Sequence, residues 1–321
     1  MIFLARSQFC SPVLKAARAQ AGRLISYFIL SLIVNASISA QVNNASPGGI
    51  DWTPVEARLS AAIRDGNIEQ KRDALLEIRN FRSERASRLA LPALRDSDPM
   101  VRATAAGSVV FAPKSEASSS LTPLLNDKQE FVRREAAYAL GEVQDKAATT
   151  ALVQLMQHDK ILEVRTAAAI SLGKIGDATA MQPLLAILKT RPKDDDEFLR
   201  RSAARSIGQI AQIIVTGNPS VVTPQNFLPE KFKDLGSSDA TGPATQIFTA
   251  ATDVLVAVLR NKNESDDTRR EAAYALGALG DLKSVAVLQT YLSDPDPYLA
   301  EISKEALLKI ERRNKVTTPT N

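Results

Sequence analysis

The 321-residue chain has one cysteine, Cys10, and one histidine, His158. A single cysteine excludes a disulfide within the chain and a zinc site of the cysteine-rich type. A single histidine excludes any site that needs two imidazoles from one chain, which removes much metalloenzyme chemistry. The rest of the composition, 45% hydrophobic and 24% charged, is that of an ordinary folded protein. It therefore excludes whole-chain disorder and a collagen-like structure.

Acidic residues are missing from residues 1–40, which carry a net charge of +4. The basic residues of this segment are Arg6, Lys15, Arg18 and Arg23. The whole chain also has a net charge of +4, so residues 41–321 are neutral overall. A neutral body has no excess positive charge to attract nucleic acid, and we expect no nucleic-acid partner.

The leader has the three parts of a secretory signal peptide. Its basic region is followed by the apolar run Leu24–Val34 and by small residues that end at Ala40. We expect residues 1–40 to be cleaved after Ala40, residues 41–53 to form a linker, and the protein to be periplasmic or secreted. The alternative is an uncleaved N-terminal anchor in the inner membrane, although the run is about half of the ~20 residues that a spanning helix needs.

An internal repeat dominates the rest of the chain. Arg133–Gly141 and Arg269–Gly277 have the same nine-residue sequence, RREAAYALG, 136 positions apart. Weaker copies place an arginine at the same point of the motif, so that the arginines of the series are Arg102, Arg133, Arg165, Arg200 and Arg269. Their steps are 31, 32, 35 and 69 residues, and a sixth copy has Ala300 at this point after a further 31. The step of 69 predicts one repeat plus an irregular insertion, which we place at 215–243 because of its prolines and glycines.

Each copy of the motif has the apolar spacing of a helix. Val132, Ala136 and Leu140 fall at i, i+4 and i+8, which gives one stripe of small and large apolar residues. We expect Gly141 and its equivalents to end this helix as left-handed C-caps. The unit is therefore a pair of antiparallel helices, with the motif on the second.

A first helix precedes each motif helix. Asp145, Asp177 and Asp281 stand where three of these helices begin, and an aspartate there caps free N–H groups. We expect Pro123 and Pro183 to bend the first helix of their repeats.

The repeated pattern D-x-x-V-R-x-x-A-A-x-x-L-G resembles the HEAT repeats, in the short form named after the phycobilisome lyases. The resemblance implies an all-α fold, a right-handed α-solenoid of about seven antiparallel helix pairs over residues 54–312. Degenerate repeats at both ends fit the expected capping units, and residues 313–321 are expected to be a disordered tail.

Three charged features have structural explanations. By the resemblance, the motif arginines hold the stacked repeats together, because each pairs with a carboxylate of its own or the next repeat. The helix caps Asp145, Asp177 and Asp281 are expected to have a structural role in the same stack. The acidic run Asp194–Glu197 lacks a calcium-loop pattern and instead favours the start of a helix. His158 stands at a helix end, and we expect it to be an ordinary surface residue. No motif for a catalytic nucleophile accompanies it.

The resemblance extends to two active families. One is an iron-dependent hydroxylase of deoxyhypusine, which binds its metal through repeated His-Glu pairs, and this chain has no His-Glu dipeptide. The other is the phycobilin lyases, for whose tetrapyrrole no feature of the sequence provides a site. We therefore expect no enzyme activity, no catalytic or metal-binding residue and no cofactor.

The expected function is that of a non-catalytic exported scaffold, which binds a protein or peptide partner on the concave face formed by the second helices. The candidate partner-binding residues point away from the alanine stripe, and they are Arg134, Tyr138, Arg201, Arg205, Arg270 and Tyr274. Two alternatives stay open. One is an enzymatic or cofactor-handling protein with a site near the 215–243 insertion, and the other is a membrane-anchored accessory subunit of an envelope complex.

Overall fold

The structure is a computed structural model that describes residues 51–193, 195–217 and 245–316. Contacts divide the chain into two units, residues 1–55 and 56–321. The described end of the first unit, residues 51–55, lies in the loop before helix α2 and in its first turn. The predicted leader and most of the predicted linker lie outside the described residues.

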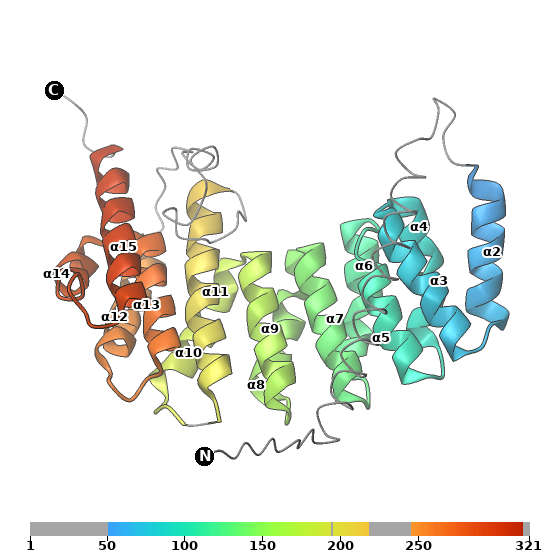
Figure 1. The fold of residues 1–321 in the computed structure, drawn as a ribbon, viewed down its shortest axis with the longest axis horizontal. Coiled ribbons are helices and arrows are strands. Elements are labelled where there is room, and N and C mark those ends of the chain that lie inside the picture. The colour runs from blue at the N-terminus through green and yellow to red at the C-terminus, as the bar shows by residue number, and fades with distance from the viewer. Residues whose placement is uncertain (1–50, 194, 218–244, 317–321) are drawn as a thin grey trace, which may run out of the picture. The chain divides into compact units, whose positions relative to one another are not determined.

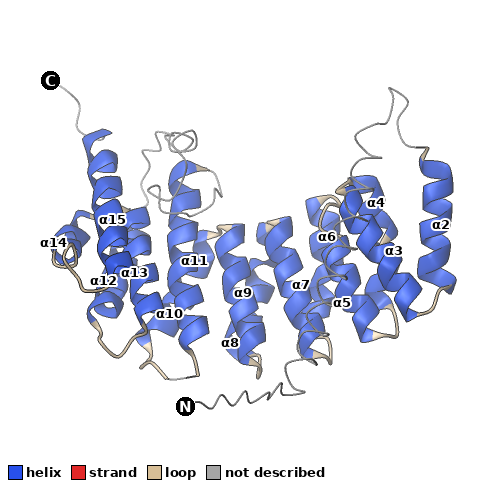
Figure 2. Cartoon of the chain, in the orientation of Figure 1, coloured by secondary structure: helices blue, strands red, loops and turns tan. Residues whose placement is uncertain are grey.

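Every regular element in the described ranges is a helix (Figure 2). The first helices of the pairs are α2 (Trp52–Asp65), α4 (Glu84–Leu89) with η1 (Leu91–Arg95), α6 (Lys114–Leu121) with η2 (Thr122–Asn126), η3 (Lys146–Ala148) with α8 (Thr149–His158), η4 (Ala178–Ala180) with α10 (Met181–Lys189), α12 (Thr245–Arg260), and η7 (Leu282–Ser284) with α14 (Val285–Gln289). The second helices are α3 (Ile68–Phe81), α5 (Pro99–Ser108), α7 (Glu130–Val143), α9 (Leu162–Ile175), α11 (Glu197–Thr216), α13 (Asp266–Leu279) and α15 (Pro297–Val316).

The helix pairs stack in chain order (Figure 1). From α3 to α15, each second helix packs against the next one, and the first helices α6, α8, α10, α12 and α14 pack against the second helix that follows each of them. The seven pairs confirm the predicted all-α solenoid and its number of repeats. The surface that the second helices present away from the first helices is called the second-helix face below.

Small residues allow the second helices to approach one another closely. Val132, Ala136 and Leu140 are fully buried, as the predicted stripe requires. A Cβ atom at Gly141 would lie 2.7 Å from the hydroxyl oxygen of Ser171 on the next second helix. Gly277 faces Ala306 in the same way, with 2.7 Å to its Cα atom. These glycines therefore set the distance between neighbouring repeats.

This packing corrects the prediction that the motif glycines end their helices. Gly141 lies inside α7, and the left-handed residue is Gln144, three positions later, with φ 55°. Gly176 and Gly280 take the same place after α9 and α13, with φ 72° at each, and donate their N–H to Leu172 and Leu276. The cap belongs to the second glycine of the pattern L-G-x-x-G, because only there does the chain leave the helix.

The aspartates at the predicted helix starts are N-caps. Asp145, Asp177 and Asp281 precede η3, η4 and η7, and each side chain accepts a hydrogen bond from the backbone N–H two residues later. The two prolines stand in the first turns of their helices. Pro123 lies in the first turn of the separate 3₁₀-helix η2, and Pro183 in the first turn of α10, where its missing N–H leaves no helical bond unmade.

The boundaries of the insertion and of the tail differ from the predicted ones. Helix α11 continues to Thr216, so residues 215–216 are helical, and α12 begins at Thr245. Helix α15 runs to Val316, past the predicted start of the tail, because Arg313 donates to the backbone oxygen of Leu279 at 2.6 Å. Among the described helices, none is long and apolar enough to cross a membrane.

Candidate functional site

Two of the motif arginines form matching ion pairs between repeats. Arg102 donates from Nε and Nη2 to Asp127, at 2.7 and 3.0 Å, and from Nη1 to the backbone oxygen of Asp96. Arg133 holds Asp159 in the same way, at 2.6 and 3.0 Å, and the backbone oxygen of Asp127. Each pair ties a second helix to the end of the next first helix, as a stacking role requires.

The other motif arginines vary this arrangement. Arg165 donates to the backbone oxygen of Met156. Arg269 donates to that of Leu259, and it also pairs with Asp266 of its own repeat at 3.3 Å and with Asp294, after the next first helix, at 4.0 Å. Arg200 is 1% exposed and forms a buried pair with Glu264, 64 residues away on the far side of the insertion.

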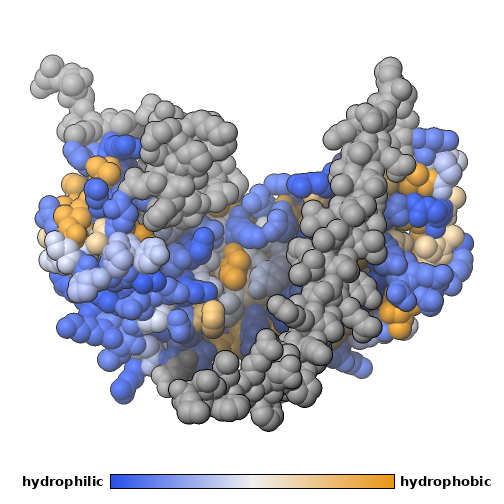
Figure 3. All heavy atoms as spheres, in the orientation of Figure 1, coloured by the Kyte–Doolittle hydropathy of each residue, from blue (hydrophilic) through white to orange (hydrophobic). Residues whose placement is uncertain are grey.

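A pocket of about 720 Å³ lies on the second-helix face between α9, α11, α13 and α15. The described atoms on the side of the molecule seen in Figure 3 are mostly hydrophilic. We call this pocket the C-terminal pocket. Its volume is that of a small-molecule site. Its cationic side chains are Lys174, Arg201, Arg205, Arg270 and Lys309, and its acidic ones are Asp267, Glu271 and Glu305. Its uncharged polar side chains are Tyr274, Tyr298, Ser202, Ser206 and Gln209.

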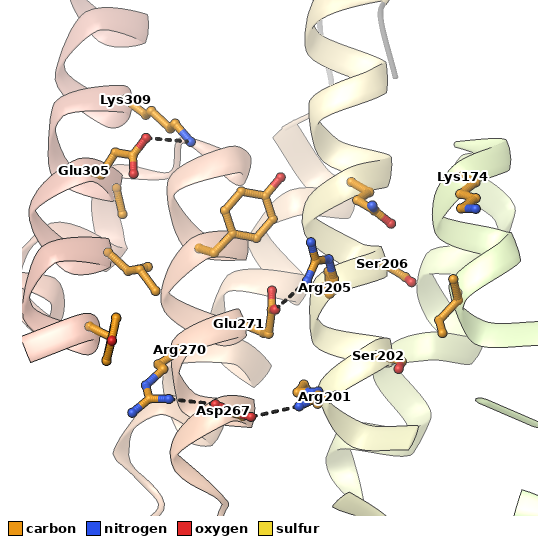
Figure 4. Close-up of a pocket in the computed structure, with 16 residues that line it drawn as sticks. Lys174, Arg201, Ser202, Arg205, Ser206, Asp267, Arg270, Glu271, Glu305 and Lys309 are labelled. Carbon is orange, nitrogen blue, oxygen red and sulfur yellow. Dashed lines mark hydrogen bonds and ion pairs between the residues drawn. The ribbon is translucent and has the colours of Figure 1, made fainter. Parts of the chain in front are cut away.

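Ion pairs cross the C-terminal pocket from α11 to α13 (Figure 4). Asp267 accepts hydrogen bonds from Arg201 at 2.8 Å and from Arg270 at 2.7 Å. One turn further along α13, Glu271 accepts one from Arg205 at 3.1 Å. Both arginines of α11 are therefore oriented by carboxylates of α13.

Glu271 has an unusual environment for a carboxyl group. Its side chain is 19% exposed, and burial raises its pKa, which the charges of Arg205 and Arg201 oppose only in part. A raised pKa keeps a proton on this carboxyl at a higher pH than on a solvated glutamate. Perturbed acids of this kind, in a pocket, are candidates for acid–base chemistry.

Tyr274 stands one turn after Glu271 on α13. Its hydroxyl is buried and has no hydrogen-bond partner within the described residues, and burial raises its pKa. Its ring packs against the backbone of α11 at Gly208, where a Cβ atom would lie 2.5 Å from the ring. The glycine thus admits the ring between the two helices.

The C-terminal pocket brings together four of the six candidate partner-binding residues, Arg201, Arg205, Arg270 and Tyr274. Arg134 and Tyr138 lie on α7, outside its lining. The sequence reasoning missed the acidic members of the site. Glu271 was visible as the glutamate of the repeated motif RREAAYALG, three residues before the tyrosine on the same helical face.

The residues that could ligate a metal by their type do not form a metal site in the described part of the chain. His158 is exposed at the last turn of α8. In the run Asp194–Glu197, Asp194 lies outside the described residues, Asp196 accepts from the backbone of Lys193, and Glu197 begins α11. Across the described ranges no three His, Cys, Asp or Glu side chains are grouped to hold a metal ion. These residues do not fit the His-Glu iron centre that the resemblance to the hydroxylase implies.

Curated relatives of this chain are enzymes by name. It is 25% identical over 279 residues to deoxyhypusine hydroxylase-B of Oryza sativa subsp. japonica, which covers 77% of this chain and 90% of that protein. It is also 25% identical over 270 residues to deoxyhypusine hydroxylase of Arabidopsis thaliana, covering 81% and 77%.

These relatives overturn two expectations. The prediction of a non-catalytic scaffold is wrong, and so is the prediction that the chain is not an enzyme, because proteins that align with most of its length are named as hydroxylases. The alternative of an enzymatic or cofactor-handling protein fits better. The reasoning failed because it took the absence of one ligand set for the absence of chemistry. The polar groups of the C-terminal pocket come from four helices, and no local motif displays them together.

A solved structure and a family model were also found to be similar to this chain. The complex of CpcE and CpcF of phycocyanin lyase from Nostoc sp. PCC7120 aligns with 85% of this chain and 96% of that chain, with a TM-score of 0.43 and 19% identity. The model of the HEAT repeats matches residues 55–139, 118–208 and 243–313, which is more than half of the chain. The chain therefore belongs to the HEAT repeat family.

Proposed function

We propose that the protein is an enzyme that acts on a substrate bound in the C-terminal pocket, with Glu271 as the group that transfers a proton. The observation that carries the proposal is the raised pKa of a carboxyl that lines a pocket of ligand size. An acid–base group works best when its pKa lies near the working pH, and burial moves Glu271 in that direction. The enzyme names of the relatives support a catalytic protein of this fold.

The surrounding side chains have defined parts in this proposal. Arg205 holds the carboxylate form of Glu271 at 3.1 Å and so limits the rise of its pKa. Tyr274 provides a buried hydroxyl that can donate a hydrogen bond to the substrate, because nothing in the described part of the chain takes that bond.

The proposal can be tested without knowing the substrate. The purified protein and Glu271→Gln are incubated with a fractionated metabolite extract, and mass spectrometry follows which compounds disappear. Glu77→Gln is the matched control, because Glu77 is a partly exposed glutamate of α3, outside the C-terminal pocket, that pairs with Arg58. We expect at least one compound to be converted by the wild type and by Glu77→Gln but not by Glu271→Gln. Equal conversion by all three proteins, or no conversion by the wild type, would count against the proposal.

A further inference from the structure

The arginines of the C-terminal pocket keep part of their hydrogen-bonding capacity. A guanidinium has five N–H donors. Arg201 and Arg205 each use Nη1 alone, on Asp267 and on Glu271, and their Nε and Nη2 groups make no hydrogen bond to other residues that the structure describes. Arg270 uses Nε on Asp296 and Nη1 on Asp267, which leaves Nη2. The carboxylates therefore orient these side chains without saturating them.

Two exposed aromatic rings support the same guanidiniums. The guanidinium of Arg201 lies 4.9 Å from the ring centre of Phe198, and that of Arg270 lies 5.1 Å from the ring centre of Tyr298. Phe198 is 60% exposed and Tyr298 is 57% exposed. A cation–π contact on one face and a carboxylate at one edge restrict the side chain, so a ligand that binds the remaining N–H groups loses less side-chain entropy.

The spacing of the two arginines of α11 allows both to face the same ligand. Arg201 and Arg205 are four residues apart and lie one turn from each other on one face of α11. Both line the C-terminal pocket, and their side chains are 34% and 48% exposed. The lining has five cations and three carboxylates, and Lys174 and Arg270 also pair with Glu142 and Asp296 outside it, so a preference for an anion rests on the unused N–H groups and not on net charge.

We infer that the ligand of the C-terminal pocket carries an anionic group, a carboxylate or a phosphate, which the unused N–H groups of Arg201 and Arg205 bind. The inference rests on the proposed function for the identity of the site and names the class of substrate. A planar guanidinium matches both oxyanions with two parallel hydrogen bonds, which an ammonium group does not provide. The substrate then presents the rest of its structure to Glu271 and Tyr274 on α13.

The test is a calorimetric titration of the full protein with three probes. Inorganic phosphate and pyrophosphate represent a phosphate group, and citrate represents a carboxylate. Spermidine is the probe of opposite charge. Arg201→Lys and Arg205→Lys keep the positive charge but remove the planar guanidinium that can donate two parallel hydrogen bonds. Arg58→Lys is the matched control, because Arg58 on α2 forms an exposed ion pair. Far-UV circular dichroism verifies that each variant is folded.

We expect saturable binding of at least one anion at physiological salt, weakened about tenfold by each change on α11 and unchanged by Arg58→Lys. Tighter binding of pyrophosphate assigns a phosphate group, and tighter binding of citrate a carboxylate. Absence of saturation with all three anions, preference for spermidine, or equal affinity of the α11 variants and the wild type overturns the inference.

Glu271→Gln separates this inference from the proposed function. Anion binding that survives in Glu271→Gln while conversion is lost supports both statements. Anion binding together with unchanged conversion in Glu271→Gln refutes the catalytic role of Glu271 and leaves the anion site standing. Conversion with a KM that Arg201→Lys and Arg205→Lys do not change refutes the anion site and leaves the catalytic role standing.

Discussion

Arg200→Met removes one partner of a buried ion pair, and we expect it to lower the free energy of unfolding by about 3–5 kcal/mol. Glu264 is 2% exposed at its side chain, so its charge would lose its partner without gaining water. Arg200 also donates to the backbone oxygens of Ile187, Leu188 and Thr190. The contact with Leu188 is buried, and a buried acceptor without a donor costs about 1–3 kcal/mol, so its loss adds to the loss of the pair.

The double variant Arg200→Met/Glu264→Leu isolates the two contributions. It removes the uncompensated charge but leaves the three carbonyl groups without Arg200, so we expect it to be more stable than Arg200→Met and less stable than the wild type. Arg58→Met breaks an exposed pair with Glu77, and surface pairs contribute about 0–1 kcal/mol.

The assay is urea unfolding followed by circular dichroism at 222 nm, with hydrogen exchange to localise the change. Because each repeat contacts only its neighbours, the loss of protection should be centred on α10, α11 and the loop before α13. If Arg200→Met were as stable as Arg58→Met, or if the double variant were the least stable of the three, the reasoning from burial would be refuted.

Four further predictions concern separate parts of the chain. Burial alone would raise the pKa of Asp159, but hydrogen bonds from Arg133 and from the backbone of Ile161 lower it below its usual 3.8, so its stabilisation is present above that pH and lost as the pH falls through the lower value. The difference in melting temperature between the wild type and Asp159→Asn should therefore shrink below pH 4, and a constant difference down to pH 2 would contradict this. Gly208→Ala should cost about 1–3 kcal/mol by displacing the ring of Tyr274, measured by urea unfolding, with an unchanged midpoint as the contrary result. Gln144→Gly should stabilise α7 by about 1 kcal/mol, because glycine adopts a φ of 55° without the cost to a side chain; a lower midpoint would argue against it. Because the sequence predicts cleavage after Ala40, N-terminal sequencing of the protein purified from its native source should begin at Gln41, and a start at Met1 would exclude cleavage.

The sequence was sufficient to predict the fold because the repeat encodes it. Identical apolar positions recur in each copy, and a helix pair can bury them only by stacking on the next pair. The role of the motif glycine was not predictable in the same way. A glycine at a helix end and a glycine at a helix contact look alike in one dimension, and only the neighbouring Ser171 or Ala306 distinguishes them.

The candidate site was predicted in part. Periodicity indicated which side chains of α11 and α13 leave the alanine stripe, and four of these do line the pocket. Periodicity carries no information on which helices lie side by side across the insertion. The pairing of Arg201 with Asp267, and of Arg205 with Glu271, spans 66 residues in each case and depends on that arrangement.

The bond between Arg200 and Glu264 has a consequence for engineering the chain. Together with the packing of α11 on α13, it joins the helices that precede and follow the segment between Gly217 and Thr245. Lengthening a connection between elements that already pack together costs little, since the entropy of closure grows only with the logarithm of its length. This segment is therefore the place to insert a reporter domain, or to divide the protein into two fragments that reassociate.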